Sequence, residues 1–370
     1  ETVKSEDMFE LTSEEETFVF KDVDSDTYPS AFREFSAPIR LAPDFTDDDL
    51  AFLMARDTDP FNQWDAAQTL FLKEIKQLVS KIQSGKPLSV NPTLVQAFST
   101  ALKTSDKDKA FSAKALALPL ETEIKDHYET IDVEAIHHAR QFLKKEIAGK
   151  LTAELKEVFK SSGKSDPADI SHEAMANRSL KNLCLSYLGS LNEDWAKEMV
   201  RTQFESAQNM TDEFSALKIL VNTDQKLRSS ACSAFYDKWY SQALVLDKWF
   251  AVQAQSNLDD TLSLVKGLAS HKDFALSNPN KVRALIYTFA MHNPLHFHQA
   301  DGKGYEFVSQ TILGLDKINH QVAARLAGCF NLWKRYDSDR QTLMKKELET
   351  IAGTQGLSKN LYEIVSRALE

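Results

Sequence analysis

Over most of the chain, apolar residues recur at intervals of three and four positions, the spacing of one face of an α-helix. Residues 61–80 show this spacing, and residues 238–255 place a second aromatic and aliphatic stripe in the same register. Comparable stretches continue from residue 171 to the C-terminal region. Short amphipathic helices joined by short loops pack as antiparallel neighbours, and a long series of them curves. The pattern therefore predicts a mainly α protein, built as a superhelical array of antiparallel α-hairpins.

Residues 1–45 have a different pattern. Apolar and polar residues alternate over 16–23 and again over 30–41, and Tyr28-Pro29 stands between the two stretches. This alternation predicts two short β-strands joined by a turn. Two strands alone are marginally stable in water, so they need a further sheet or the following helices to cover their apolar face. The helical pattern begins at Thr46, which is followed by three aspartates suited to a helix N-terminus.

Composition narrows the range of partners. The 370 residues include 54 acidic and 44 basic ones, a formal net charge of −10. This balance argues against nucleic acid or an anionic membrane as the main partner. The content of 11 glycines disfavours a glycine-rich nucleotide-binding fold. After Pro167 only Pro279 and Pro294 occur, which leaves room for almost continuous helix.

Three cysteines, Cys184, Cys232 and Cys329, lie far apart in apolar surroundings. We expect buried free thiols and a reducing compartment, hence a cytoplasmic protein. The sequence shows no signal peptide and no apolar run long enough to span a bilayer, so no membrane partner is expected. The acidic surface and the lack of a heptad seam favour a monomer. Because the chain starts at Glu1, we also expect it to be a fragment of a longer protein.

Candidate metal ligands do not assemble into a recognisable site. His172 and Glu173 begin like the zinc motif H-E-x-x-H, but its fifth position is Ala176, so the second imidazole is missing. The adjacent histidines at 137–138 point to different faces of a helix. His296 and His298 alternate with no Cys or carboxylate cluster beside them. No Ser or Cys has a nucleophile signature. We therefore expect no catalytic residue and no metal site in this chain.

The stretch 271–290 is the best candidate for binding a small anion. Asn278 can cap a helix that starts at Pro279, and Lys281 and Arg283 add positive charge to its first turn. Helix N-termini favour anions, and an arginine strengthens this preference. The other interpretation is a well-capped surface helix whose charges are simply solvated. The residues alone leave both interpretations open.

Seven stretches, taken in order, resemble a known family. They are EFSAPIRL (34–41), DPFNQWDAAQTL (59–70), QNMTDEFSAL (208–217), YDKWYSQALVLDKWFAVQA (236–254), NPNKVRALI (278–286), DGKGYEF (301–307) and KRYDSDRQ (334–341). Together they resemble the C-terminal part of the bacterial aminopeptidase N family, the alanyl aminopeptidases among the gluzincin zinc metallopeptidases. The resemblance extends from about residue 16 to the C-terminus, and seven ordered stretches are more specific than any one of them.

The resemblance implies a division at residues 1–45 and 46–370. The first range would be the end of a β-sandwich domain, and the second the family's C-terminal helical domain, which forms a bowl over the active site. The full-length enzyme would remove N-terminal residues from peptides. Its zinc ion and its catalytic residues would belong to the missing N-terminal and catalytic domains. This chain has none of the family's zinc ligands or catalytic residues. It would restrict access and line the substrate cavity, would be inactive in isolation and would need no cofactor of its own.

The resemblance also implies substrate-binding residues. It points to Arg283 of NPNKVRAL, and to Gln321 and Arg325 of HQVAARL. Gln321 and Arg325 are four residues apart and so share one helix face. Two arginines on a cavity wall would attract the carboxylate of a peptide. The family has Asn-Pro before this glutamine where the present chain has Asn319-His320, so the start of the helix can differ.

A second hypothesis is a stand-alone helical-repeat scaffold that binds peptides or proteins on its concave face. The two hypotheses differ in what precedes Glu1 in the gene. An in-frame H-E-x-x-H upstream of this residue would support the peptidase, and its absence would support the scaffold.

Overall fold

The computed structural model describes residues 8–21, 28–36, 44–163, 166 and 168–370. Among these residues the regular secondary structure is helical, and no strand is formed. The helices of the first half are α1 (Asp47–Arg56), α2 (Pro60–Gln83), α3 (Pro92–Lys103), α4 (Lys109–Ala115), α5 (Glu121–Ile124), α6 (Val133–Lys150), α7 (Thr152–Ser162), α8 (His172–Gly189), α9 (Asp194–Ser206) and α10 (Met210–Leu220).

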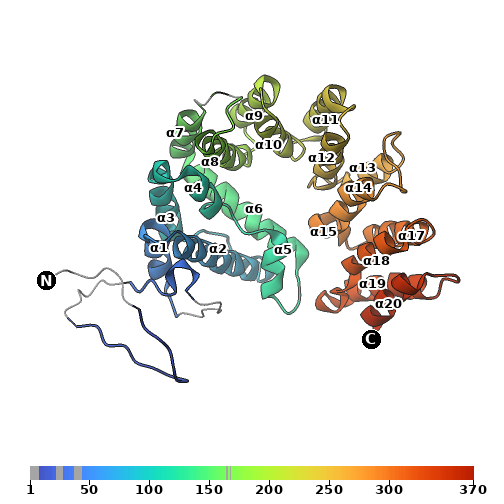
Figure 1. Cartoon of the computed structure of the whole chain (residues 1–370), viewed down its shortest axis with the longest axis horizontal. Coiled ribbons are helices and arrows are strands. Elements are labelled where there is room, and N and C mark those ends of the chain that lie inside the picture. The colour runs from blue at the N-terminus through green and yellow to red at the C-terminus, as the bar shows by residue number, and fades with distance from the viewer. Residues whose placement is uncertain (1–7, 22–27, 37–43, 164–165, 167) are drawn as a thin grey trace.

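The second half continues the array. Its helices are α11 (Gln225–Trp239), α12 (Ala243–Ala254), α13 (Thr261–Leu268), α14 (Pro279–Val282), the π-helical turn η4 (Arg283–Tyr287), α15 (Thr288–His292), α16 (Pro294–Phe297), α17 (Lys303–Asp316), α18 (His320–Ala327), α19 (Ser338–Ala352) and α20 (Lys359–Leu369). Successive helices lie side by side along a curved path, with α6 crossing the middle of the view (Figure 1). The predicted superhelical array of helices is confirmed.

Local sequence signals set where several helices begin. Thr46 caps α1 through a capping box, in which its Oγ1 accepts from the Asp49 N–H and the Asp49 carboxylate accepts from the Thr46 N–H. Asn91 caps α3 by accepting from the backbone N–H of Thr93. The prediction of a single helix over 238–255 is wrong. The chain turns between α11 and α12, where the N–H of Gln242 donates to the carbonyl of Trp239 at 2.8 Å.

The two predicted β-strands are not formed in the described residues. Residues 16–21 have no regular structure, and Arg33–Phe35 form a 3-10 helix. The other parts of the two predicted strands, 22–27 and 37–41, lie outside the described residues. A strand needs a neighbour for its backbone hydrogen bonds, and the described residues supply none. The side chains of Phe18 and Phe20 are correspondingly exposed.

One continuous apolar core follows the curve of the array. It runs from Leu50 in α1 to Val365 in α20 and includes the fully buried rings of Phe71, Phe250 and Phe297. Because the amphipathic helices share this core, each is stabilised by its neighbours more than by its own propensity. No helix in the described part of the chain combines the length and the apolar character needed to cross a membrane.

Two segments far apart in sequence close the curve. The backbone N–H of Ile131 donates to the carbonyl of Arg335 at 2.7 Å. The guanidinium of Arg340 pairs through Nη2 with Glu134, at the start of α6, and through Nη1 with Asp337 at 2.8 Å. The segment between α5 and α6 thus meets the segment before α19, and the array returns on itself.

Candidate functional site

The stretch around Asn278 forms the capped helix start that the sequence predicts. The side-chain oxygen of Asn278 accepts from the N–H of Asn280 at 3.0 Å, and Pro279 occupies the first turn of α14. The helix then widens into the π-helical turn η4, which begins at Arg283. Arg283 is exposed, and its Nη1 donates to the side-chain oxygen of Asn280 at 3.3 Å. The guanidinium therefore keeps most of its donors facing solvent.

Lys281 does not belong to this solvent-facing group, contrary to the sequence interpretation. Its ammonium lies 2.7 Å from the carboxylate of Asp247 in α12 and donates to the carbonyl of Ala243. It also lies over the ring of Phe250, 5.5 Å from the centroid. The side chain is buried and its charge is compensated, so it cannot serve an incoming anion.

Gln321 and Arg325 lie one turn apart on α18, and both are exposed. Asn319 caps this helix by accepting from the N–H of Val322, so the helix begins at His320 without a proline. Neither the Gln321 side chain nor the Arg325 side chain has a hydrogen bond or ion pair with another described residue. Within the described residues, no such contact joins either of them to Arg283. The structure thus exposes the three predicted side chains but does not join them directly.

Of the histidines singled out in the sequence, His137, His296 and His298 are buried, whereas His138 and His172 are exposed. His298 Nδ1 lies 2.8 Å from the hydroxyl of Tyr305, and His296 Nδ1 lies 3.1 Å from the Gln299 amide. Burial lowers the pKa of both imidazoles below the usual range. His137 Nδ1 lies 2.8 Å from the carboxylate of Glu121. Among the described residues, no three His, Cys, Asp or Glu side chains gather as metal ligands.

The cysteines offer no nucleophile. Cys184, Cys232 and Cys329 are buried and free, as expected from the sequence. Burial raises the pKa of the Cys184 and Cys232 thiols to about 12 and that of Cys329 further. A buried thiol of high pKa stays protonated and behaves as a small apolar side chain.

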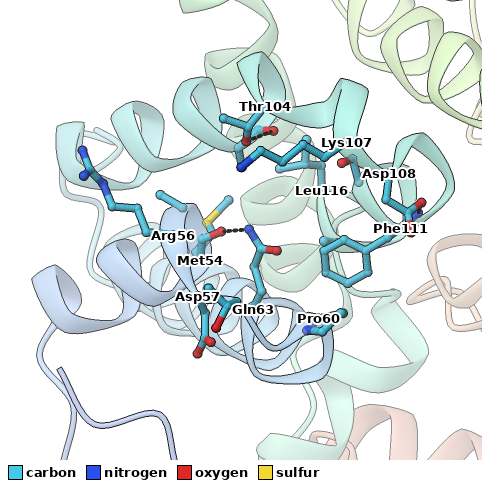
Figure 2. A pocket seen from close by; sticks show the side chains of 15 residues that line it. Met54, Arg56, Asp57, Pro60, Gln63, Thr104, Lys107, Asp108, Phe111 and Leu116 are labelled. Carbon is cyan, nitrogen blue, oxygen red and sulfur yellow. Dashed lines mark hydrogen bonds between the residues drawn. The ribbon is translucent and has the colours of Figure 1, made fainter. Parts of the chain in front are cut away.

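A hollow of about 350 Å³, which no sequence pattern predicts, lies between α1, α2, α3 and α4. Figure 2 shows Arg56 at the left of it, the Phe111 ring at the right and Lys107 above. Gln63 closes part of the floor by donating to the carbonyl of Met54 at 2.8 Å. The lining combines apolar surface with two exposed cations. Neither this hollow nor the smaller one between α7, α8, α9 and α10 includes Arg283, Gln321 or Arg325.

A long curved array of helical hairpins, with a continuous core and no assembled metal or nucleophile site among its described residues, is the architecture of an ARM-type helical-repeat domain. The chain belongs to the family described as "Domain of unknown function (DUF3458_C) ARM repeats", whose model matches residues 47–370. This range begins one residue after the Thr46 cap, where the helical pattern starts.

Relatives place this domain in a larger context. Aminopeptidase N of Escherichia coli (strain K12) is 38% identical over 359 residues, covering 97% of this chain and 41% of the relative. Aminopeptidase N of Haemophilus influenzae is 34% identical, covering 98% of this chain and 42% of the relative. The solved structure of Legionella pneumophila aminopeptidase A in complex with aspartic acid has a TM-score of 0.82 and 29% identity, covering 91% of this chain and 40% of that one. The chain spans about two-fifths of the length of these relatives and is homologous to their C-terminal part.

Proposed function

We propose that the chain is the C-terminal helical part of a zinc-dependent aminopeptidase that removes N-terminal residues from peptides. The observation that carries this proposal is the match to aminopeptidases N of several bacteria over nearly the whole chain. The chain's partners are then peptide substrates and the preceding domains of the same protein, with residues 1–45 as the end of the adjoining β-sandwich domain. The proposed compartment is the cytoplasm, and the proposed state is a monomer.

In this proposal the helical array covers the active site, restricts access to peptides and lines the substrate cavity. Arg283, Gln321 and Arg325 form its polar wall. The guanidinium of Arg325 is exposed and has no ion pair with a described residue, so it is available to a peptide carboxylate. Gln321, one turn away on the same face, adds an amide that can donate or accept beside it.

Zinc does not fit the residues of this chain. His172 lies at the first position of α8, and the position one turn later is Ala176, so the helix supplies a single imidazole. No group of three metal-ligating side chains occurs in the described residues. We therefore assign zinc and the catalytic residues to the preceding domains of the full-length enzyme, and none of the chemical steps to this chain.

The first test addresses the wall. In the full-length enzyme, Arg325→Ala should raise KM for short peptides about tenfold and leave kcat nearly unchanged, because a charged hydrogen bond to the bound peptide is lost. The control is Arg367→Ala, which removes another exposed arginine, in α20, that pairs with Glu363. Arg325→Ala kinetics that match those of Arg367→Ala would rule out the role of Arg325.

The second test addresses the division of labour. The 370-residue chain should fold, bind no stoichiometric zinc by metal analysis and hydrolyse no alanyl amide substrate. Zinc-dependent turnover by the purified chain would contradict the proposal. The alternative, a stand-alone peptide-binding scaffold, is distinguished by reading the gene upstream of Glu1. An in-frame H-E-x-x-H supports the peptidase, and its absence supports the scaffold.

A further inference from the structure

A second hollow, of about 200 Å³, lies where α7 ends, α8 and α9 pass and α10 begins. We call it the α7–α10 hollow. Its lining is mostly polar and comprises Ser162, Gly163, Arg178, Lys181, Gln203, Ser206, Ala207, Gln208, Asn209 and Asp212. Gly163, Ser206 and Gln208 are exposed, so the hollow is reached from solvent.

Three buried side chains of this lining each keep one polar atom without a hydrogen-bond partner. They are Ser162 through Oγ, Arg178 through Nη1 and Gln203 through Oε1, and the residues are 2%, 8% and 6% exposed. Seven such atoms occur among the described residues, and three of them belong to this one hollow. Buried polar groups normally have partners, so these three atoms need water or a bound group to supply them.

The other atoms of these side chains are fixed by neighbours. Arg178 Nη2 donates to the carbonyl of Asp169 at 2.7 Å. Gln203 Nε2 donates to the Asn182 side-chain oxygen at 2.7 Å and to the Asp212 carbonyl at 3.1 Å. These two bonds identify the nitrogen of the Gln203 amide, so the unpartnered atom is an acceptor.

The charges of the wall favour an anion. Lys181 is compensated by Asp212, whose carboxylate lies 2.7 Å from its ammonium. The carboxylate of Asp169 accepts from the N–H and hydroxyl of Ser171. Arg178 forms no ion pair with a carboxylate within the described residues. The hydrogen bonds of Ser171 and, to a smaller extent, the charge of Arg178 lower the pKa of the Asp169 carboxylate. Arg178 Nη1 still has no partner and can donate to an anion.

We propose that the α7–α10 hollow binds a small carboxylate that has an amino or hydroxyl group on the adjacent carbon. The carboxylate accepts from Arg178 Nη1 and Ser162 Oγ, and the adjacent group donates to Gln203 Oε1. This pattern satisfies the three unpartnered atoms together. At about 30 Å³ for each water in the liquid, the hollow has room for about seven waters, which is enough space for an amino acid or hydroxy acid with a small side chain.

Four compounds separate the parts of this proposal, measured as the rise in melting temperature of the 370-residue chain and as Kd by calorimetry. Glycine has the carboxylate and an amino group on the adjacent carbon. Glycolate has the carboxylate and a hydroxyl group on the adjacent carbon. Acetate lacks the donor, and ethanolamine lacks the carboxylate. Glycine and glycolate should bind, acetate should bind about tenfold more weakly, and ethanolamine should not bind.

Variants of the wall complete the test. Ser162→Ala removes a hydroxyl with no partner, so it should leave the ligand-free melting temperature unchanged or higher and weaken glycine binding about tenfold. Arg178→Gln should abolish binding. The control Arg201→Gln removes the same charge from the exposed face of α9, where Arg201 pairs with Glu198 at 2.6 Å, and should bind glycine normally.

Three results would overturn the assignment. The first is that none of the four compounds raises the melting temperature, which would leave water as the occupant. The second is that acetate binds as tightly as glycine, and the third is that the Ser162→Ala variant binds glycine as tightly as the Arg201→Gln variant does. If Arg178→Gln does not fold, Ser162→Ala alone decides, because that substitution breaks no hydrogen bond.

Discussion

His298 is the centre of a buried polar cluster between α16 and α19. Its Nδ1 lies 2.8 Å from the Tyr305 hydroxyl, its ring stacks on Tyr336 at 4.2 Å, and its carbonyl accepts from Arg340 Nε at 2.7 Å. Burial, together with the positive charge of Arg340, lowers the pKa of His298 well below its usual value, and Asp337 opposes this only partly. The imidazole is therefore neutral in the folded protein.

This neutral histidine gives stability a defined pH dependence. The unfolded chain binds a proton at His298 with a pKa of about 6.5, whereas the folded chain does not. The contribution of His298 to the free energy of unfolding is thus fully present above that pKa. It is lost as pH falls below that pKa, by up to about 1.4 kcal/mol per pH unit. Urea midpoints measured between pH 7.5 and 5 should fall, and His298→Gln should flatten the decline. His138→Gln, at an exposed position, is the control, and equal slopes in both variants would contradict the assignment to His298.

The roles of some single residues could be predicted from the sequence, and those of others could not. Asn278 and Pro279 were predicted as a helix start because capping depends on neighbours in sequence. Lys281 was assigned wrongly because its partner Asp247 is 34 positions away and nothing in a local pattern pairs them. Arg283 and Arg325 were named through resemblance, and their exposure is compatible with the role, which stays a prediction. The unpartnered atoms of the α7–α10 hollow could not be predicted from the sequence, because they depend on how the helices pack and on which side chains lack a hydrogen-bond partner there.

At the scale of the helices, the spacing of apolar residues predicted most helices but not the turns that separate them. The stripe over 238–255 continues across the turn between α11 and α12, because both helices face the same core. A period alone therefore could not reveal the break. The strands expected near residues 16–23 and 30–41 had the correct alternation, but a strand depends on partners that the described residues do not provide.

Two glycines of α17 should respond in opposite ways to the same substitution. A Cβ at Gly304 would lie 2.4 Å from the carbonyl oxygen of Phe297, where backbone cannot yield easily. A Cβ at Gly314 would meet Leu276 at 3.5 Å, an ordinary contact. Gly304→Ala should therefore lower the free energy of unfolding by more than about 2 kcal/mol. Gly314→Ala should raise it by about 0.5–1 kcal/mol through helix propensity. Denaturant unfolding measures both, and the same sign for the two variants would refute the close approach at Gly304.

Taken as one body, the array has a property that no single helix has. A helical solenoid is held mainly by contacts between neighbouring repeats. Here Lys125 and Glu134 also contact Arg335 and Arg340, although more than 200 positions separate the partners. The sequence predicted the curvature from short hairpins, but not its closure. Closure depends on the summed rotation of all the helices and on two arginines that meet backbone carbonyls and a carboxylate at the far end.

Removing these two arginines should open the array. Arg335 Nη2 donates to the carbonyls of Lys125 and Tyr128, at 3.1 and 2.5 Å, and Arg340 pairs with Glu134. Each loss of charged hydrogen bonds costs about 1.5–3 kcal/mol, so the double variant Arg335→Ala, Arg340→Ala should lose several kcal/mol. Its radius of gyration by small-angle scattering should increase, and its unfolding should separate into two transitions, since the ends no longer support each other. The double control Arg201→Ala, Arg367→Ala removes two exposed arginines and should keep both the dimensions and the single transition. An unchanged radius of gyration in the first double variant would mean that packing between neighbouring helices alone fixes the curve.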